Sequence, residues 1–473
     1  MSEPLVAGVD SSTQSCKIVV CEAATGRVVR QARASHPDGT QVCAAAWWTA
    51  FEDARAGGLL DGVSAIAVGG QQHGMVTLDA DDELVRDAML WNDTSSAPQA
   101  AALIEEFGGP AAWVEAVDLV PVASFTGTKL RWLADNEPDN AARTATVVLP
   151  HDWLTGRILA DGNGFDGWTT DRGDASGTAY WSPVTEQYRP DLVRLAFGRE
   201  IGLPRVLRPA EAAGRTADGM LVAAGTGDNA AAALGLSIEP GDVVVSLGTS
   251  GAVFAVHDRA VGDLSGAVAG FADATGRHLP LLATLNAARV LVAAAAALDV
   301  DLAGLDALAA QAPIGADGLT LLPFLDGERT PNLPTARGTL AGITRTNSSP
   351  AHLARAYVEG MLCNLKGCID ALVRNGIHAR RVLLIGGAAA AQSVRAAAAD
   401  IFGVPVLVPQ PGEYVALGAA RQAAWALSGA SVPPEWTVPV AATVEPSDVE
   451  AGARAAERYR EVLGSMHPGA SVG

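Results

Sequence analysis

Short apolar runs rich in Val and Ile alternate along this chain with longer stretches rich in Ala and Leu. The short runs have the length and composition of strands, whereas the longer stretches have the length of helices. The clearest predicted strands lie at 17–21, 65–69, 243–247, 382–385 and 404–408. This alternation of strands and helices indicates an α/β fold.

Two of the predicted strands lead into the same pattern of small polar residues. Residues 6–15 read Val-Ala-Gly-Val-Asp-Ser-Ser-Thr-Gln-Ser, residues 243–251 read Val-Val-Val-Ser-Leu-Gly-Thr-Ser-Gly, and another strand follows each. Each segment predicts a hairpin with a hydroxyl-rich turn, although ordinary tight hairpins also favour Gly and Ser. Because Thr13 and Thr249 occupy matching places just under half a chain apart, we interpret the pattern as an internal duplication.

A duplicated chain of 473 residues is long enough for two large domains. The turn signal Pro240-Gly241 precedes the second hairpin, so we expect one lobe at 1–240 and another at 241–473. If the lobes face each other, both turns meet at one cleft. Their backbone donors could then hold a polyphosphate from two sides.

The charge and cysteine content narrow the partners and the compartment. With 33 Lys and Arg against 52 Asp and Glu, the formal charge of −19 repels nucleic acid and anionic membranes. The five cysteines form no Cys-x-x-Cys pair, which fits a reducing compartment. The longest apolar run, 290–298, is shorter than the roughly 20 residues that span a bilayer. No secretory signal pattern opens the chain. We therefore expect a cytoplasmic protein without a nucleic-acid or membrane partner.

Asp228 is the first candidate for chemistry. It follows Thr226-Gly227 and precedes the Ala-rich stretch 229–236, so it lies where a loop delivers a residue to a helix N-terminus. Asp in that position can simply cap the helix. It can also accept a proton from a bound hydroxyl, as phosphoryl transfer requires. The helix dipole favours the charged carboxylate, so we expect it to be ionised at neutral pH.

Asp10 lies in the first hairpin beside hydroxyl groups. Ser12 and Thr13 could bind phosphate, and Lys17 stands on the following strand. A carboxylate next to such groups suits a Mg²⁺ ion held largely through water. The alternative is an Asp that caps its own turn.

Two further segments could bind a polyol. Gln72 and His73 lie between glycines at the end of a predicted strand, where amide and imidazole groups can approach a ligand closely. Trp91 and Asn92 could add an apolar platform beside a polar group, although a core Trp followed by a polar turn is nearly as good an interpretation.

The second half contributes glycines at another strand end. Gly386 and Gly387 close the strand 382–385 and would allow a nucleotide to approach the backbone, although a Gly pair is a weak signal alone. The segment 326–331 is dense in charge, which either function or a salt-bridged turn explains. The sequence has no P-loop, His-Glu-x-x-His or Gly-x-Ser-x-Gly motif, which argues against P-loop kinases, zinc hydrolases and α/β-hydrolases.

Taken together, these segments resemble the FGGY family of carbohydrate kinases, and they cover nearly the whole chain in family order. The matching segments are Gly8-Val-Asp-Ser-Ser-Thr-Gln-Ser15, Gln72-His73-Gly74, Leu90-Trp-Asn-Asp93, Leu149-Pro150, Gly227-Asp228-Asn229, Ser246-Leu-Gly-Thr-Ser250, Gly327-Glu-Arg-Thr-Pro331, Leu384-Ile-Gly-Gly387 and Val415-Ala-Leu-Gly418.

The resemblance implies two ribonuclease H-like, actin-like lobes that close on a sugar and ATP, with the sugar mainly on the first lobe and ATP mainly on the second. It implies Asp228 as the general base, Asp10 as the residue for Mg²⁺ and the reactive phosphate, and Gln72, His73 and Asn229 near the sugar. Gly248 and Thr249 would contact ATP phosphates, and Gly386 and Gly387 would border the adenosine. The resemblance also suggests a homodimer.

One departure and two alternatives belong with this prediction. Residues 388–391 are all alanine where the family often has a third Gly and polar residues, so side-chain bonds to the nucleoside are in question. A sugar sensor without activity would keep the fold, but both hydroxyl-rich hairpins and both carboxylates speak against it. An actin-like filament ATPase would need polymerisation surfaces, of which the sequence gives no sign.

Overall fold

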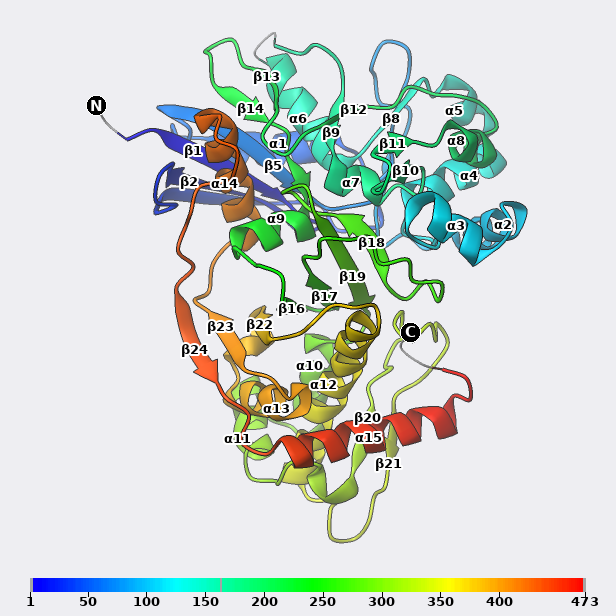
Figure 1. The fold of residues 1–473 in the computed structure, drawn as a ribbon, viewed down its shortest axis with the longest axis vertical. Helices are drawn as coiled ribbons and strands as arrows, with labels where there is room; N and C mark the ends of the chain where they lie inside the picture. Colours follow the sequence, from blue (N-terminus) through cyan, green and yellow to red (C-terminus); the bar gives the residue numbers. More distant parts are fainter. Residues whose placement is uncertain (1–2, 162–163, 471–473) are drawn as a thin grey trace.

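The computed structural model describes residues 3–161 and 164–470 and folds into two lobes, each built on a seven-stranded mixed sheet (Figure 1). In spatial order, the first sheet consists of β13 (Ala212–Arg215), β14 (Leu221–Ala223), β5 (Val63–Gly70), β1 (Leu5–Ser11), β2 (Ser15–Glu22) and β3 (Val28–Ser35), with β15 (Thr226–Gly227) also paired to β5. The second consists of β18 (Ala269–Ala272), β19 (His278–Thr284), β17 (Gly251–Ala255), β16 (Asp242–Leu247), β22 (Arg381–Ile385), β23 (Val406–Pro409) and β24 (Val440–Val444).

The two sheets repeat one topology. β1 runs antiparallel to β2 and parallel to β5, and β16 runs antiparallel to β17 and parallel to β22. The next strands match as well, because β14 and β23 add in parallel while β13 and β24 close the edges in antiparallel. The predicted α/β fold with two related lobes is confirmed.

The remaining elements are helices and short strand pairs. The first half carries α1 (Ala45–Arg55), α2 (Ala97–Glu106), α3 (Pro110–Val117), α4 (Thr126–Asn136), α5 (Pro138–Arg143), α6 (Pro150–Asp161), α7 (Arg172–Ser176), α8 (Pro190–Phe197) and α9 (Asp228–Gly235). The second half carries α10 (Ala288–Ala297), α11 (Leu302–Ala309), α12 (Pro350–Arg374), α13 (Gln392–Phe402), α14 (Tyr414–Ser428), α15 (Val449–Met466) and the 3₁₀ turns η1 (Ala316–Gly318) and η2 (Gly387–Ala390). Short two-stranded pairs are β4 (Gln41–Val42) with β7 (Ala88–Met89), β6 (Val76–Leu78) with β8 (Thr146–Val148), β9 (Thr169–Asp171) with β12 (Arg205–Leu207), β10 (Trp181–Ser182) with β11 (Gln187–Tyr188), and β20 (Thr320–Leu322) with β21 (Thr339–Ala341).

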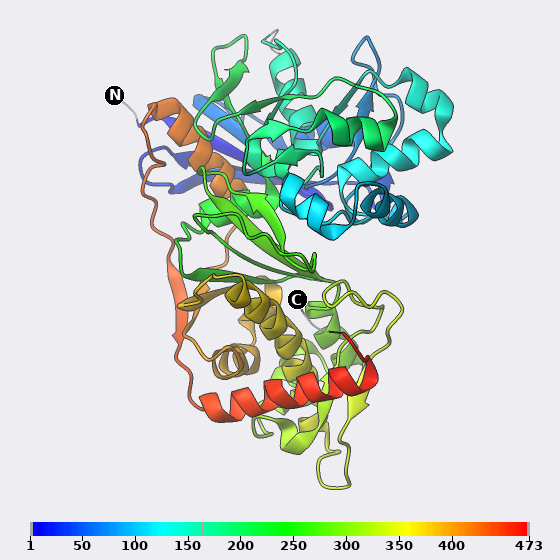
Figure 2. The same ribbon diagram turned by 45° about the vertical axis from the view of Figure 1, so that its right-hand side comes forward.

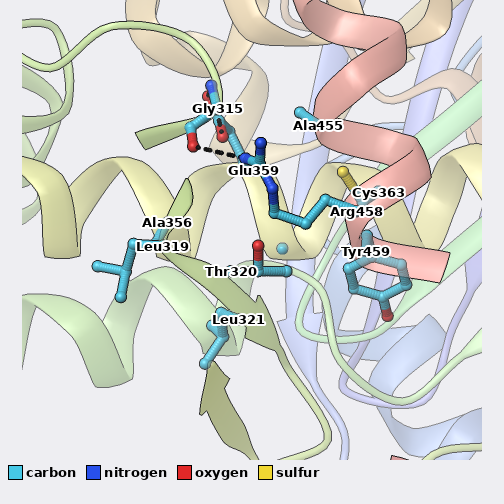
Figure 3. A pocket seen from close by; sticks show the side chains of 11 residues that line it. Gly315, Leu319, Thr320, Leu321, Ala356, Glu359, Cys363, Ala455, Arg458 and Tyr459 are labelled. Carbon is cyan, nitrogen blue, oxygen red and sulfur yellow. Dashed lines mark hydrogen bonds between the residues drawn. The ribbon is translucent and has the colours of Figure 1, made fainter. Parts of the chain in front are cut away.

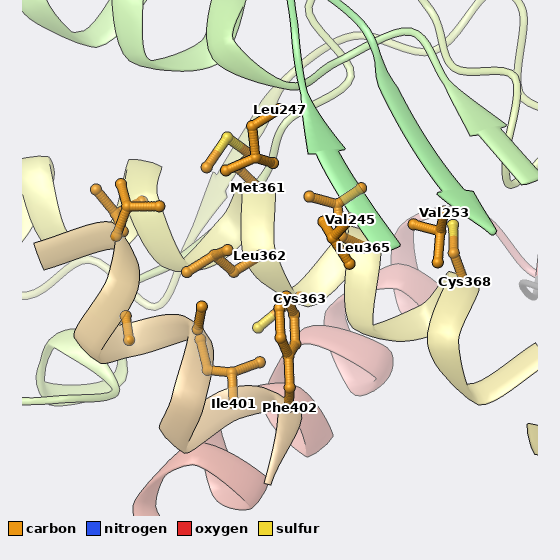
Figure 4. Close-up of a cluster of buried hydrophobic side chains, with 14 of the residues drawn as sticks. Val245, Leu247, Val253, Met361, Leu362, Cys363, Leu365, Cys368, Ile401 and Phe402 are labelled. Carbon is orange, nitrogen blue, oxygen red and sulfur yellow. The ribbon is translucent and has the colours of Figure 1, made fainter. Parts of the chain in front are cut away.

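The core of the second lobe lies between its sheet and the helices α12 and α13 (Figure 4). Val245 of β16 lies beside Leu365 of α12, and Val253 of β17 lies beside Cys368 of the same helix. Phe402 of α13 belongs to the same cluster. The 25-residue α12 begins where Ser349 accepts a hydrogen bond from the backbone N–H of His352, a regular N-cap.

One helix from the second half of the chain crosses to the first lobe. The orange helix α14 packs against β1, β5 and α9 (Figure 1). Its backbone lies so close that a Cβ added to Gly8, Gly235 or Gly418 would come within 1.8 to 2.1 Å of a backbone oxygen on the facing element. These glycines are therefore required by close packing. The boundary at Pro240-Gly241 stays a prediction, and the crossing of α14 was not foreseen.

The lobes also meet along the β18 edge of the second sheet, where the green strands reach the first lobe (Figure 2). The backbone N–H of Gly270 donates to the carbonyl of Asp118 at 3.0 Å, and that of Ala272 donates to Ser176 Oγ at 2.9 Å. One apolar cluster, which contains Phe125 and Phe271, spans both halves of the chain. Within the described residues, no helix is long and apolar enough to cross a membrane.

Candidate active site

Asp228 is the first residue of α9, the helix that lies between the two sheets. One side of α9 packs against α14, and its alanines share an apolar cluster with Val244 and Leu383 of the second sheet. Gly227 occupies the N-cap position, so Asp228 does not cap the helix in the usual way. Its Oδ1 instead accepts bonds of 2.8 Å from both the backbone N–H and the side-chain Nδ2 of Asn229.

The prediction that Asp228 is fully ionised at neutral pH is wrong. Burial raises the pKa of Asp228 to about 7, and the carboxylates of Asp10 and Asp174 add to the shift. These effects outweigh the helix dipole and the two bonds from Asn229. The carboxyl group therefore changes protonation state near neutral pH, which is where a general base is most effective.

Asp10 lies in β1 with its side chain buried. Ser12 Oγ donates a short hydrogen bond to one carboxylate oxygen, and Lys17 Nζ lies 3.4 Å from the other. Lys17 also pairs at 2.6 Å with Glu413, which precedes the crossing helix α14. Burial raises the pKa of Asp10, although Ser12 and Lys17 oppose the shift.

Gln72 connects the segment predicted to bind the sugar to Asp228. Its Oε1 accepts a bond of 3.1 Å from Asn229 Nδ2, the same amide that holds Asp228. Its side chain packs over Gly227, where an added Cβ would come within 2.6 Å. Gly227 is therefore needed for the contact between these two segments. The neighbouring Gln71 is buried and its side-chain amide finds no partner among the described residues.

His73 stands in an aromatic and basic environment. Its ring packs edge-on against Phe125 at 4.8 Å and lies 5.4 Å from Phe271, which comes from the second sheet. Nδ1 lies 2.9 Å from the carbonyl of Gly177. Burial lowers the pKa of His73 well below its ordinary value of 6.5, and Lys129 and Arg329 lower it further. The imidazole is therefore neutral, with Nδ1 donating to Gly177.

The two cations near His73 were not predicted. Lys129 of α4 is fully buried, donates to the carbonyl of His73 at 3.2 Å, and burial lowers its pKa to about 7. Arg329 reaches from the second half of the chain to within 3.4 Å of Ser124 Oγ. The sequence signal that could have revealed Lys129 is its place on the apolar face of a helix, next to Leu130 and Leu133. The segment 326–331 therefore contributes Arg329 to this region.

Trp91 and Asn92 lie beside the first hairpin. Trp91 Nε1 donates to Thr13 Oγ1 at 2.8 Å, so this Trp is tied to the turn and is not a pure core residue. The side-chain oxygen of Asn92 is buried without a partner in the described part of the chain. Such an atom can accept a bond from a ligand hydroxyl.

The glycines predicted for the nucleotide lie together at the ends of two adjacent parallel strands. Gly248 and Thr249 follow β16 and are exposed, and their carbonyls accept bonds from the Ala288 N–H at 2.9 Å and Arg289 Nε at 3.3 Å. Gly386 follows β22 with a φ of 95° and sits so close to Leu247 that a Cβ would come within 2.5 Å of its oxygen.

Gly387 borders open space, because an added Cβ would meet nothing within 4 Å. Ala388 to Ala390 complete the turn η2 with Gly387. Backbone groups are thus what this turn offers a ligand. In the described ranges, no hydrogen bond or ion pair links the predicted site residues of the first lobe to Gly248, Thr249, Gly386 or Gly387.

A separate small pocket lies in the second lobe between β20, α12 and α15 (Figure 3). Glu359, Arg458 and Tyr459 line it, and Glu359 accepts the backbone N–H of Gly315 at 2.9 Å. Burial raises the pKa of Glu359 to about 7. None of its described lining residues is a predicted site residue, so the pocket is distinct from the group around Asp228.

The duplicated sheets and the paired hydroxyl-rich turns define the two-lobed fold of a carbohydrate kinase. The chain belongs to the FGGY family of carbohydrate kinases, whose N-terminal domain matches residues 5–235 and whose C-terminal domain matches residues 243–427.

Similar proteins cover almost the whole chain. A xylulose kinase of Streptomyces coelicolor is 47% identical over 90% of this chain and 89% of its own length. A xylulose kinase of Streptomyces rubiginosus is 44% identical over 98% of this chain and 97% of its own. The crystal structure of xylulose kinase from Bifidobacterium adolescentis superposes with a TM-score of 0.89 at 46% identity, covering 98% of this chain and 100% of that one.

Proposed function

We propose that this chain transfers the γ-phosphoryl group of ATP to the terminal hydroxyl of D-xylulose, giving D-xylulose 5-phosphate. The similar proteins named above, which cover this chain almost from end to end, support the choice of sugar. The observation that carries the chemistry is the placement of Asp228, a carboxyl group with a pKa of about 7, beside the Asn229–Gln72 contact.

Asp228 acts as the general base in this proposal. Asn229 holds Oδ1 through two bonds, which leaves Oδ2 to accept the proton of the sugar hydroxyl. Above pH 7 most of the population carries a free carboxylate, and orientation supplies most of the catalytic effect. His73 and Asn92 then offer a neutral imidazole and an unpartnered carbonyl oxygen to the sugar hydroxyls.

The residues around Asp10 fit a Mg²⁺ ion that accompanies ATP. Mg²⁺ retains water and commonly binds proteins through one or two carboxylates. Asp10 supplies one carboxylate next to Ser12 and Thr13, and Lys17 adds positive charge for phosphate. The ion would supply charge neutralisation at the phosphates.

The open turns of the second lobe suit the nucleotide. Gly248 and Thr249 would hold the phosphates, and Gly386 and Gly387 would border the adenosine. With Ala388 to Ala391 beyond them, recognition of the base would rest on backbone groups and shape. The predicted homodimer and cytoplasmic location stay predictions.

A sugar panel tests the substrate. Purified protein is assayed for ADP release with ATP and Mg²⁺ in the presence of D-xylulose, D-ribulose, glycerol or gluconate. We expect kcat/KM for D-xylulose to exceed each of the others by at least about tenfold. A clear preference for another sugar would overturn the substrate, and sugar binding without ADP release would indicate a sensor.

A further inference from the structure

Three buried side chains from three different elements hydrogen-bond residues 224–226, the segment that leads to Asp228. His151 of α6 contacts the carbonyl of Ala224 through Nε2 at 3.3 Å. Gln422 of the crossing helix α14 donates to the carbonyl of Gly225 at 3.0 Å. Asp171 of β9 accepts a bond of 2.7 Å from Thr226 Oγ1. Residues 224 to 226 thus each bond a side chain from another element, and Thr226 and Gly227 also pair with β5 as β15.

His151 differs from the other two because both of its ring nitrogens make polar contacts. Its other ring nitrogen, Nδ1, lies 2.5 Å from Asp174 Oδ2, and both side chains are completely buried. Both ring nitrogens therefore face oxygen acceptors, so both carry hydrogen and the ring is an imidazolium. Burial opposes this charge, but Asp152 and Asp174 outweigh it and raise the pKa of His151 to about 10.

His151 also packs so closely against two neighbouring glycines that neither could carry a side chain. An added Cβ on Gly225 would come within 2.7 Å of His151 Cδ2, and one on Gly70 would come within 2.7 Å of His151 Cβ. Gly225 has a φ of 74°, which favours glycine independently. His151 is thus packed between the segment before Asp228 and the end of β5.

His151, Asp152 and Asp174 could in principle hold a metal ion, because their ligand atoms lie within 4.8 Å of one another. The contact of 2.5 Å between His151 and Asp174 argues against it. Two ligands of one tetrahedral ion with bonds of about 2.0 Å stand roughly 3.3 Å apart. An imidazolium has no free lone pair for a metal. The pair is a buried ion pair.

We propose that His151, oriented by Asp174, is a positioning residue for catalysis: it fixes the carbonyl of Ala224 and with it the peptide segment that presents Asp228. Asp174 has a second effect, because its negative charge acts on Asp228 together with that of Asp10. The inference rests on the proposed role of Asp228 as the base.

The groups that face these charges come from four elements and from the segment after α7. Asp10 of β1 and Asp174 of α7 face Asp228, while Asp152 of α6 and Asp171 of β9 face His151. Tyr180, after α7, faces Asp152 and Asp174. Burial raises the pKa of both Asp152 and Asp174, and the charge of His151 opposes that rise. Of these groups, Asp10 and Asp174 act on Asp228.

A pair of substitutions at one position separates positioning from simple stability. His151→Gln keeps an amide donor near the place of Nε2, so it can still bond the carbonyl of Ala224. His151→Asn keeps a donor near the place of Nδ1 and loses that contact. We expect His151→Asn to lower kcat about 100-fold with little change in the sugar KM, and His151→Gln to retain at least about a tenth of wild-type kcat. Equal kcat values for the two variants would overturn the positioning role.

Asp174→Asn tests the effect of the Asp174 charge on the pKa of Asp228. Asp152→Asn, in the same buried cluster, is its matched control. Loss of the negative charge at Asp174 should move the acidic limb of the kcat profile to lower pH by about half a unit or more. The control should leave that limb in place. If the acidic limb of the kcat profile is unmoved in Asp174→Asn, or moves equally in both variants, the proposed effect of the Asp174 charge on Asp228 is refuted.

The wild-type protein provides a readout that needs no variant to fold. Nitrogen-15 NMR of its eight histidines should show one ring with two protonated nitrogens at pH 8, a signal absent from His151→Gln. A neutral His151 ring at pH 8 would refute the ion pair. If Asp228→Asn retains normal turnover, the role of Asp228 itself fails. If only the His151 and Asp174 variants behave like wild type, this inference alone fails.

Discussion

Replacement of Asp228 by Asn should stabilise the protein while it removes the proposed base. The pKa of Asp228 is raised from 3.8 to about 7 by burial and by Asp10 and Asp174. A shift of about three units corresponds to at most about 4 kcal/mol. Because the side chain is partly exposed to solvent, which screens its charge, we take about half of that, or about 2 kcal/mol. Asn keeps the oxygen that accepts the bonds from Asn229, so the gain is not offset by a lost contact.

The gain should depend on pH in a defined direction. Between pH 3.8 and about 7, folded Asp228 holds a proton that the unfolded chain has released, so its contribution to stability falls as the pH rises through this range. The full penalty is present above pH 7, and roughly a third of it is present at pH 5. The advantage of Asp228→Asn should therefore be larger at pH 8 than at pH 5.

Thermal unfolding at the two pH values measures this effect. At pH 8 we expect Asp228→Asn to raise Tm by about 4 °C, if the first lobe unfolds as a unit. Asp53→Asn removes an exposed carboxylate on α1 and should leave Tm unchanged. A lower Tm for Asp228→Asn at pH 8, or the same shift at both pH values, would refute the placement of the carboxyl group among like charges.

Three further outcomes follow from the structure. Asp10→Asn should lower kcat about 100-fold or more and raise the Mg²⁺ concentration for half-maximal rate, and an unchanged metal titration would contradict the proposed site. Because His73 is neutral, nitrogen-15 NMR should show its ring with one protonated nitrogen from pH 6.5 to 9, and a second protonated nitrogen in this range would contradict its low pKa. Gly418→Val would place a Cβ 1.8 Å from the oxygen of Ala231 and should destabilise the fold by about 3 kcal/mol or more in denaturant titrations, whereas Gly464→Ala, which faces open space, should not.

Local patterns were sufficient to predict several central strands of each sheet and the duplication. The apolar run 243–247 became β16 at Asp242–Leu247, with one more residue at its start. The run 65–69 became β5 at Val63–Gly70, with two more residues at its start and one at its end. The crossing of α14 could not be read in this way. Its close contact depends on Gly8, Gly235 and Gly418, which are far apart in sequence and meet only in the folded chain.

The same limit applies to the site. A helix N-terminus predicts an ionised Asp228, but burial and the charges of Asp10 and Asp174 reverse the balance, and none of these is a local property. His151 follows Leu149-Pro150, a segment that the family resemblance included without a role. Only the fold shows that its ring lies between Asp174 and the loop before Asp228.

The most direct test of the central claim compares wild type with Asp228→Asn on D-xylulose, measuring ADP release and sugar affinity in the same preparations. The account predicts similar dissociation constants for the sugar and a loss of at least about 1,000-fold in kcat for the variant. Near-normal ADP release by Asp228→Asn would contradict the assignment of Asp228 as the residue that takes the proton from the sugar hydroxyl.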